Sequence, residues 1–109
     1  MTDPQTGIGE PQTIQRLQRP PMYRVIMEND NFTPMEFVVQ ILRLVFGYDT
    51  ATSTAIMLTV HKNGSAVCGV YPHEIAETLA GQVVATAARY DHPLLARVER
   101  DDAGEGEAE

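Results

Sequence analysis

The polar run Asn29-Asp30-Asn31 stands directly before a predicted helix, and a histidine, His61, lies on the helix after that one. One Asn or Asp side chain is enough to stabilise a turn or cap a helix, and Asp30 or Asn31 can fill that role. The remaining polar groups are then available to a ligand. Carboxylate oxygens, amide oxygens and a neutral imidazole nitrogen accept hydrogen bonds, whereas a primary ammonium group offers three donors. An α-amino group is mostly protonated at neutral pH, so these residues predict a binding site for an amine.

Apolar residues continue from this polar run along the two predicted helices. Met35 and Val38 lie three residues apart on the first helix. Met57 and Val60 have the same spacing on the second helix, and His61 shares roughly their face. If the helices pack side by side, the four apolar side chains line a slot with the acceptors at its mouth. Burial of a Leu or Phe side chain contributes roughly 1.5–3 kcal/mol, so the slot suits an ammonium group with a large apolar group beyond it. Capture of an N-terminal amine is a known mode of peptide recognition.

Two other interpretations of the same residues remain open. A small hydrolase would use His61 together with Asp30 or Thr33, but the sequence has no G-x-S-x-G nucleophile motif, and Thr33 is explained as a helix cap. A histidine beside apolar residues is also common in protein interiors, so the chain is compatible with a structural protein-interaction domain that has no peptide pocket. The favoured hypothesis is a binding site without catalytic residues.

The other residues capable of chemistry show no comparable pattern. His73 and His92 lie at the ends of predicted elements and lack the spacing of metal ligands. The single cysteine, Cys68, lies in the apolar run SAVCGVY and is predicted to be a small buried hydrophobic residue rather than a nucleophile. The sequence therefore predicts no catalytic residue, no metal site and no cofactor.

Hydrophobic periodicity and punctuation by Gly, Pro and Asn divide the chain into six elements. In chain order these are a strand at 22–28, a helix from Thr33 to about Gly47, a helix from Asp49 or Thr50 to Asn63-Gly64, a strand at 65–71, a helix over about 73–89 and a strand at 94–99. Thr33 is the predicted N-cap of the first helix, with Pro34 in the first helical position and Glu36 completing a capping box. The strand at 65–71 is short and apolar enough to be central, and the third helix is expected to bury a stripe that includes Ile75.

The element order β-α-α-β-α-β predicts an α+β fold. We expect a two-layer sandwich in which a three-stranded antiparallel sheet packs against three helices. A chain of 109 residues holds one domain, expected over residues 21–100. The remaining segments are predicted to be a flexible N-terminal extension at 1–20 and an acidic disordered tail at 101–109.

The net charge of −7 is unevenly distributed along the chain. The last nine residues carry five acids and no base, so residues 1–100 carry ten acids and eight bases, a net charge of −2. Such a body lacks the basic patch that nucleic-acid binding requires. No segment has the composition of a membrane span or of a secretory signal, so we expect a cytoplasmic location.

Three segments, NDNFTPMEFV, IMLTVHKNGSAVCGVYPHEIAET and HPLL, closely resemble the ClpS adaptor family in order and spacing. The resemblance covers about residues 20–100. It implies a small α/β fold and an adaptor rather than an enzyme. Members of this family bind N-degron substrates, which begin with Leu, Phe, Tyr or Trp, and hand them to a ClpA-type AAA+ unfoldase partnered with the ClpP protease.

The resemblance also implies roles for individual residues. Asn29 and His61 would hydrogen-bond the α-amino group of the substrate, and Asp30 would hold its first backbone groups, with Asn31 as a weaker candidate. The residues implied to line the pocket for the first side chain are Thr33, Met35, Val38, Met57, Val60 and Leu94. Met35 is the implied steric gate that excludes β-branched first residues.

The family pattern also bears on the unfoldase and on specificity. Glu74 is implied to contact the N-terminal domain of the unfoldase, and residues 1–20 resemble the extension that engages its pore. Family members usually have Asp where this chain has Asn31, and more often an apolar residue beside the pocket where it has Glu28. In the helix that contacts the unfoldase they commonly have Lys where this chain has Leu79, so Leu79 bears on the strength of docking. These departures suggest the hypothesis of a specialised relative with a narrower range of first residues.

Overall fold

The computed structural model describes residues 20–102, so most of the predicted N-terminal extension and acidic tail lie outside the described residues. Its elements are β2 (Met22–Glu28), α2 (Met35–Phe46), α3 (Thr50–Asn63), β3 (Ser65–Pro72), α4 (His73–Arg89) and β4 (Leu95–Arg100). The observed order β-α-α-β-α-β and the three-stranded antiparallel sheet confirm the predicted α+β fold. Within residues 20–102, no helix is long and apolar enough to span a membrane.

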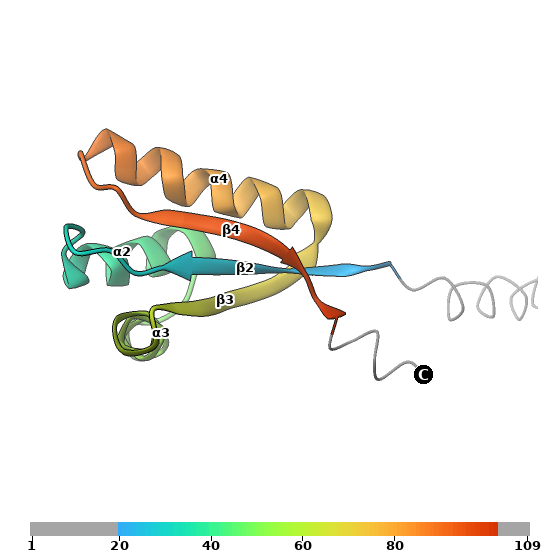
Figure 1. Ribbon diagram of the computed structural model, residues 1–109, viewed down its shortest axis with the longest axis horizontal. Coiled ribbons are helices and arrows are strands. Elements are labelled where there is room, and N and C mark those ends of the chain that lie inside the picture. Colours follow the sequence, from blue (N-terminus) through green and yellow to red (C-terminus); the bar gives the residue numbers. More distant parts are fainter. Residues whose placement is uncertain (1–19, 103–109) are drawn as a thin grey trace, which may run out of the picture.

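The sheet has the strand order β3-β2-β4, with β2 antiparallel to both neighbours. The prediction that the strand at 65–71 is central was therefore wrong, because β3 is an edge strand. Its apolar composition is misleading, since Val67 and Val70 are 45% and 41% exposed. The central strand is β2, where Val25–Met27 are all buried. Figure 1 shows β2 between β3 and β4, with α2 and α3 at the end where β2 meets the following turn.

An irregularity in β3 ties the connection between α2 and α3 to the sheet. The register with β2 skips Cys68, so that Gly69 and Val67 pair with consecutive residues of β2. A bulge of this kind leaves the extra residue outside the regular ladder. The carbonyl oxygen of Cys68 instead accepts a hydrogen bond from the Tyr48 hydroxyl, at 2.5 Å. The side chain of Cys68 is buried, as predicted.

The helices pack on the sheet through a small set of buried side chains. Helix α4 contacts all three strands, α3 contacts β3, and α2 packs against α3 and α4. The buried residues of α4 are Ala76, Ala80, Val83 and Ala87. The expectation that Ile75 belongs to this stripe was wrong, because its side chain is 49% exposed. Small alanine side chains occupy the inward positions, and the larger Ile75 lies one residue outside the stripe.

Each of the two helices that contribute to the candidate site, α2 and α3, ends at a glycine, as predicted. Gly47 follows α2 with φ of 77°, and Gly64 follows α3 with φ of 92°. Both are left-handed conformations, in which a side chain would be strained. At the other end of α3, the Asp49 side chain accepts a hydrogen bond from the Thr52 backbone N–H at 2.8 Å, which confirms one of the two predicted caps.

Two glycine-to-alanine substitutions are expected to have opposite effects on stability. Gly64→Ala should lower the free energy of unfolding by about 1–2 kcal/mol, because the left-handed conformation strains any residue with a Cβ. Gly81→Ala should raise it by about 0.5–1 kcal/mol, because Gly81 lies inside α4 and an added Cβ meets no atom within 4 Å. Urea denaturation of both variants checks this prediction. A shift of the same sign in both variants would contradict it.

Candidate functional site

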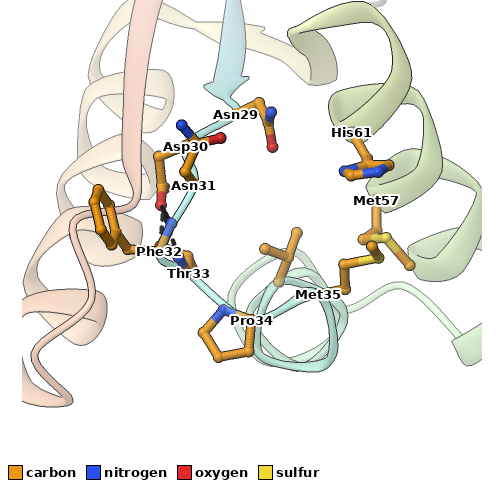
Figure 2. A pocket seen from close by; sticks show the side chains of 10 residues that line it. Asn29, Asp30, Asn31, Phe32, Thr33, Pro34, Met35, Met57 and His61 are labelled. Carbon is orange, nitrogen blue, oxygen red and sulfur yellow. Dashed lines mark hydrogen bonds between the residues drawn. The ribbon is translucent and has the colours of Figure 1, made fainter.

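A cavity of about 350 Å³ opens between the turn after β2, the start of α2 and the end of α3. It is lined by Asn29, Asp30, Asn31, Phe32, Thr33, Pro34, Met35, Val38, Met57 and His61. Figure 2 shows polar side chains along one part of the wall and the two methionines along another. The structure thus brings together the polar run, the histidine and the two methionines that the sequence analysis placed at one site.

The mouth of the cavity is built where the end of β2 meets the end of α3. The backbone N–H of Asn29 donates to the carbonyl oxygen of Gly64 at 2.9 Å, and the N–H of Gly64 donates to the carbonyl oxygen of Val60 at 2.9 Å. His61 lies in the last turn of α3. Because this end of the helix is fastened to β2, the Asn29 amide from the end of β2 and the His61 imidazole from α3 line the same cavity (Figure 2).

The carboxylate of Asp30 organises the turn between β2 and α2. Its Oδ1 accepts hydrogen bonds from the backbone N–H groups of Phe32 at 2.8 Å and Thr33 at 2.7 Å. Its Oδ2 accepts a hydrogen bond from the Thr33 hydroxyl at 2.8 Å. These bonds direct the carboxylate toward its own turn. Within residues 20–102, no hydrogen bond is seen for the side-chain amides of Asn29 and Asn31, which are the other two residues of the polar run.

The predicted capping box at the start of α2 was wrong. Helix α2 begins at Met35, and Pro34 occupies the N-cap position without a side-chain cap. The carbonyl oxygen of Pro34 accepts hydrogen bonds from the N–H groups of Phe37 and Val38, at 3.0 and 3.2 Å. Thr33 does not cap the helix because it lies one residue before the N-cap position. Its hydroxyl instead donates a hydrogen bond to the Asp30 carboxylate, and a hydrogen bond to a charged group is stronger than one between neutral groups.

Asp30 contributes a negative charge to this region. Partial burial alone would raise the pKa of the Asp30 carboxyl group, but the hydrogen bonds from Thr33 and Phe32, together with the electrostatic influence of His92, outweigh that effect. The net result is a pKa below the ordinary value of 3.8. Asp30 is therefore ionised at neutral pH, and the charge lies on a carboxylate held by its own turn.

The apolar wall of the cavity continues into the protein core. Val38 and Met57 are 6% and 9% exposed and belong to the main core cluster, whereas Met35 is 46% exposed. The side chains of Met35 and Met57 converge on the cavity from α2 and α3 (Figure 2). Val60 and Leu94, which the family resemblance placed in the pocket, are each 2% exposed. They lie in the same core cluster as Val38 and Met57 and are not part of the cavity wall.

Two residues that the sequence analysis did not assign to the site also line the cavity. Phe32 and Pro34 both belong to the turn that leads into α2. Their position in the NDNFTPMEF segment could have indicated this role, because every residue from Asn29 to Met35 contributes to the cavity wall. The ring of Phe32 is 79% exposed, and Figure 2 shows it on the outer side of the turn.

Glu28 does not line the cavity, although the family resemblance placed it beside the pocket. Its carboxylate accepts a hydrogen bond from Arg97 on the neighbouring strand β4. Its neighbour Met27 is the residue of β2 that enters the core cluster. Since successive residues of a strand point to opposite faces, Glu28 belongs to the other face of the sheet.

The two residues connected with the unfoldase lie on α4, which contributes no residue to the cavity wall. Glu74 is exposed in the first turn of that helix. Leu79 is partly buried and packs against the smaller core cluster of Val25, Ala76 and Ala80. An apolar residue at this position therefore covers part of the core.

Comparisons with known proteins show the family of this chain. A family described as "ATP-dependent Clp protease adaptor protein ClpS" matches residues 18–97. The ATP-dependent Clp protease adapter protein ClpS of Ruegeria sp. (strain TM1040) is 53% identical over 90 residues, which cover 83% of this chain and 80% of that protein. The protein of the same name from Phenylobacterium zucineum is 51% identical over 90 residues, which cover 83% of each chain.

A solved structure is also similar to this fold. Agrobacterium tumefaciens ClpS2 bound to L-phenylalaninamide matches with a TM-score of 0.75 and 37% sequence identity, over 76% of this chain and 100% of that chain. The family match spans most of the described residues, and these findings confirm the predicted family. The chain belongs to the ClpS family, whose members are adaptor proteins of the ATP-dependent Clp protease and not enzymes.

Proposed function

We propose that this protein binds the N-terminal residue of N-degron substrates and delivers them to a ClpA-type AAA+ unfoldase that works with the ClpP protease. The observation that carries the proposal is the cavity described above. Hydrogen-bond acceptors of Asn29, Asn31 and His61 surround its mouth, and methionine and valine side chains form its wall. This combination suits a free α-amino group attached to a bulky apolar side chain.

The ligand of the solved relative supports this chemistry. Agrobacterium tumefaciens ClpS2 is bound to L-phenylalaninamide. That molecule has a free α-amino group, a benzyl side chain and a carboxamide in place of the next peptide bond. It is therefore equivalent to the first residue of a polypeptide that begins with phenylalanine.

Within this proposal the polar residues have separate roles. The amide oxygen of Asn29 and a ring nitrogen of neutral His61 accept hydrogen bonds from the substrate ammonium group. Asp30 adds negative charge and holds the first backbone groups of the substrate through the lone pairs that its own turn leaves free. Asn31 supplies an amide where family members usually have a carboxylate, so the electrostatic field at the mouth is weaker here.

The apolar wall receives the first side chain. Met35 and Met57 are unbranched and flexible, and their thioethers make favourable contacts with aromatic rings. The wall therefore suits Leu, Phe, Tyr and Trp. Met35, which projects from the start of α2, excludes side chains that branch at Cβ.

Binding of the unfoldase is assigned to α4. Glu74 is exposed there, and α4 contributes nothing to the cavity wall, so the two partners would bind separate surfaces. Contact between residues 1–20 and the unfoldase pore, and the cytoplasmic location, stay predictions.

The first test measures the dependence of binding on the substrate amine. A fluorescent peptide that begins with Phe should bind, and acetylation of its amine should weaken binding more than 100-fold, because two charge-assisted hydrogen bonds of roughly 1.5–3 kcal/mol each are lost. Fluorescence anisotropy gives both affinities. Equal affinities for the free and acetylated peptides would exclude the proposed function.

His61→Ala should weaken binding of the Phe peptide roughly 10- to 150-fold, the equivalent of one charge-assisted hydrogen bond. Lys62→Ala is the matched control, because Lys62 is the next residue of α3 and does not line the cavity. Its affinity should equal that of the unmodified protein. The role of His61 is wrong if the two variants bind equally well.

Asp30→Asn should weaken binding of the same peptide about 10-fold, because it removes a charge and one acceptor of the turn. It should also lower the free energy of unfolding by about 1 kcal/mol at neutral pH. Since the folded-state pKa of Asp30 lies below 3.8, this stabilisation is complete above the unfolded-state pKa. It is lost as the pH falls through the folded-state value.

Urea denaturation at neutral and acidic pH checks this pH dependence. Asp91→Asn is the control, since Asp91 is exposed with φ of 64°, a conformation that Asn also tolerates. The control should retain full peptide affinity. A loss of stability in Asp30→Asn that stays constant down to low pH would contradict the assignment.

Glu74→Lys should abolish co-elution with the N-terminal domain of a ClpA-type unfoldase, because it reverses a charge in the proposed contact. Peptide affinity should not change, since Glu74 is remote from the cavity wall. Size-exclusion chromatography and anisotropy measure the two properties. Retained co-elution, or a parallel loss of peptide binding, would overturn the separation of the two surfaces.

A further inference from the structure

The four methionines within residues 20–102 differ in their access to solvent. Met27 is 0% exposed, Met57 is 9% exposed and Met35 is 46% exposed, while Met22 has intermediate burial. The most exposed of these methionines is thus the one at the mouth of the cavity. Oxidation of a methionine thioether depends on access to the sulfur, so Met35 is the methionine that a dissolved oxidant reaches first.

The cysteine of this protein does not compete for the same oxidant. Cys68 is 2% exposed, and burial raises the pKa of its thiol to about 12. The thiolate is the reactive form of cysteine, and very little of it exists at neutral pH with such a pKa. A thioether needs no deprotonation before it reacts. Within residues 20–102, Met35 is therefore the most accessible of the residues that carry an oxidisable sulfur.

The surroundings of Met35 cannot accommodate a sulfoxide once a ligand is bound. The neighbouring wall residues Pro34, Val38 and Met57 have no side-chain hydrogen-bond donor. The nearby hydroxyl of Thr33 already donates to Asp30. The donors of Asn29, Asn31 and His61 belong to the part of the wall that the proposed function assigns to the substrate ammonium and backbone groups. A sulfoxide oxygen covered by an apolar side chain beside Pro34, Val38 and Met57 would therefore lose its water, and burial of an unpaired polar group is unfavourable.

We propose that Met35 is a reversible oxidation site at which conversion to methionine sulfoxide prevents substrate binding. This inference rests on the proposed function. The oxidant is a hydroperoxide such as hydrogen peroxide. The Met35 sulfur attacks one oxygen of hydrogen peroxide, and the S–O bond forms as the O–O bond breaks. The departing hydroxide takes the proton of the transferred hydroxyl group, which leaves the neutral sulfoxide and water. Sulfur loses two electrons and the peroxide gains them. Methionine sulfoxide reductases reverse such a change.

A titration with hydrogen peroxide tests the site. The full chain is oxidised in steps, and peptide mapping by mass spectrometry records which methionine gains oxygen. Met35 should be oxidised before Met22, Met27 and Met57, and a saturating Phe peptide should slow oxidation of Met35 but not of Met22. Oxidation of Met35 after the other three, or at a rate that the peptide does not change, would overturn the proposal.

The consequence for binding is measured on the same samples by anisotropy. Protein oxidised only at Met35 should bind the Phe peptide at least 10-fold more weakly than untreated protein, and treatment with methionine sulfoxide reductase should restore the affinity. In Met35→Leu, the ratio of affinities before and after peroxide should be about one, whatever the starting affinity. Met22→Leu is the control that should remain as sensitive as the unmodified chain, because Met22 lies at the start of β2 and does not line the cavity.

The outcomes separate this inference from the proposed function. If untreated protein does not bind the Phe peptide, both fail. If untreated protein binds and the Met35 sulfoxide binds equally well, only the inference fails. Equal sensitivity of Met35→Leu and the unmodified chain would also overturn it, because the loss would then arise from another residue.

Discussion

The hydrogen bond from the Asn29 N–H to the Gly64 carbonyl oxygen joins the end of β2 to the end of α3. On one side of this bond the chain leaves the sheet and forms the polar turn. On the other side it leaves α3 in a left-handed conformation and enters β3. The bond therefore fixes the distance between Asn29 and His61, which come from different elements. If the helix ended one residue later, the rotation of 100° per residue would turn His61 away from the opening.

Neighbouring residues of the polar turn have different roles. Asp30 has the strongest acceptor and uses it on the backbone N–H groups of Phe32 and Thr33. This rigid turn presents the two flanking amides, Asn29 and Asn31, along the mouth of the cavity. A carboxylate that faced the ligand directly would bind an ammonium group more strongly, but the turn would then lack its main internal support. In the proposed function the charge of Asp30 also acts on the substrate ammonium group, because an electrostatic field acts at a distance, and its free lone pairs remain for the backbone groups of the substrate.

Most of this arrangement could be predicted from the sequence because its signals are local. Gly47 and Gly64 marked the ends of the two helices, because few other residue types adopt the left-handed conformation found there. The three- and four-residue spacing of apolar residues placed Met35 and Met57 on the apolar faces of their helices. The errors arose where tertiary structure decides. Thr33 has the residue type of a cap, but the sequence does not show that packing starts the helix one residue later, with Pro34 at the N-cap position. An apolar strand such as 65–71 also does not reveal whether it has one neighbour or two. The family pattern likewise does not reveal that Glu28, next to the polar turn, pairs with Arg97 of β4 and does not line the cavity.

The floor of the cavity is part of the core, and this limits how the site can vary. Val38 and Met57 line the cavity and also pack in the main cluster, so a change of their size alters folding and binding together. Truncation of a buried methionine to alanine typically costs about 2–5 kcal/mol of stability, a large share of what a small domain has. Met35 lines the cavity but is not part of the core cluster, and nearly half of its surface is exposed. A substitution or chemical modification of the cavity wall therefore costs the least folding stability at Met35. There the wall can change while the packing of the core stays intact.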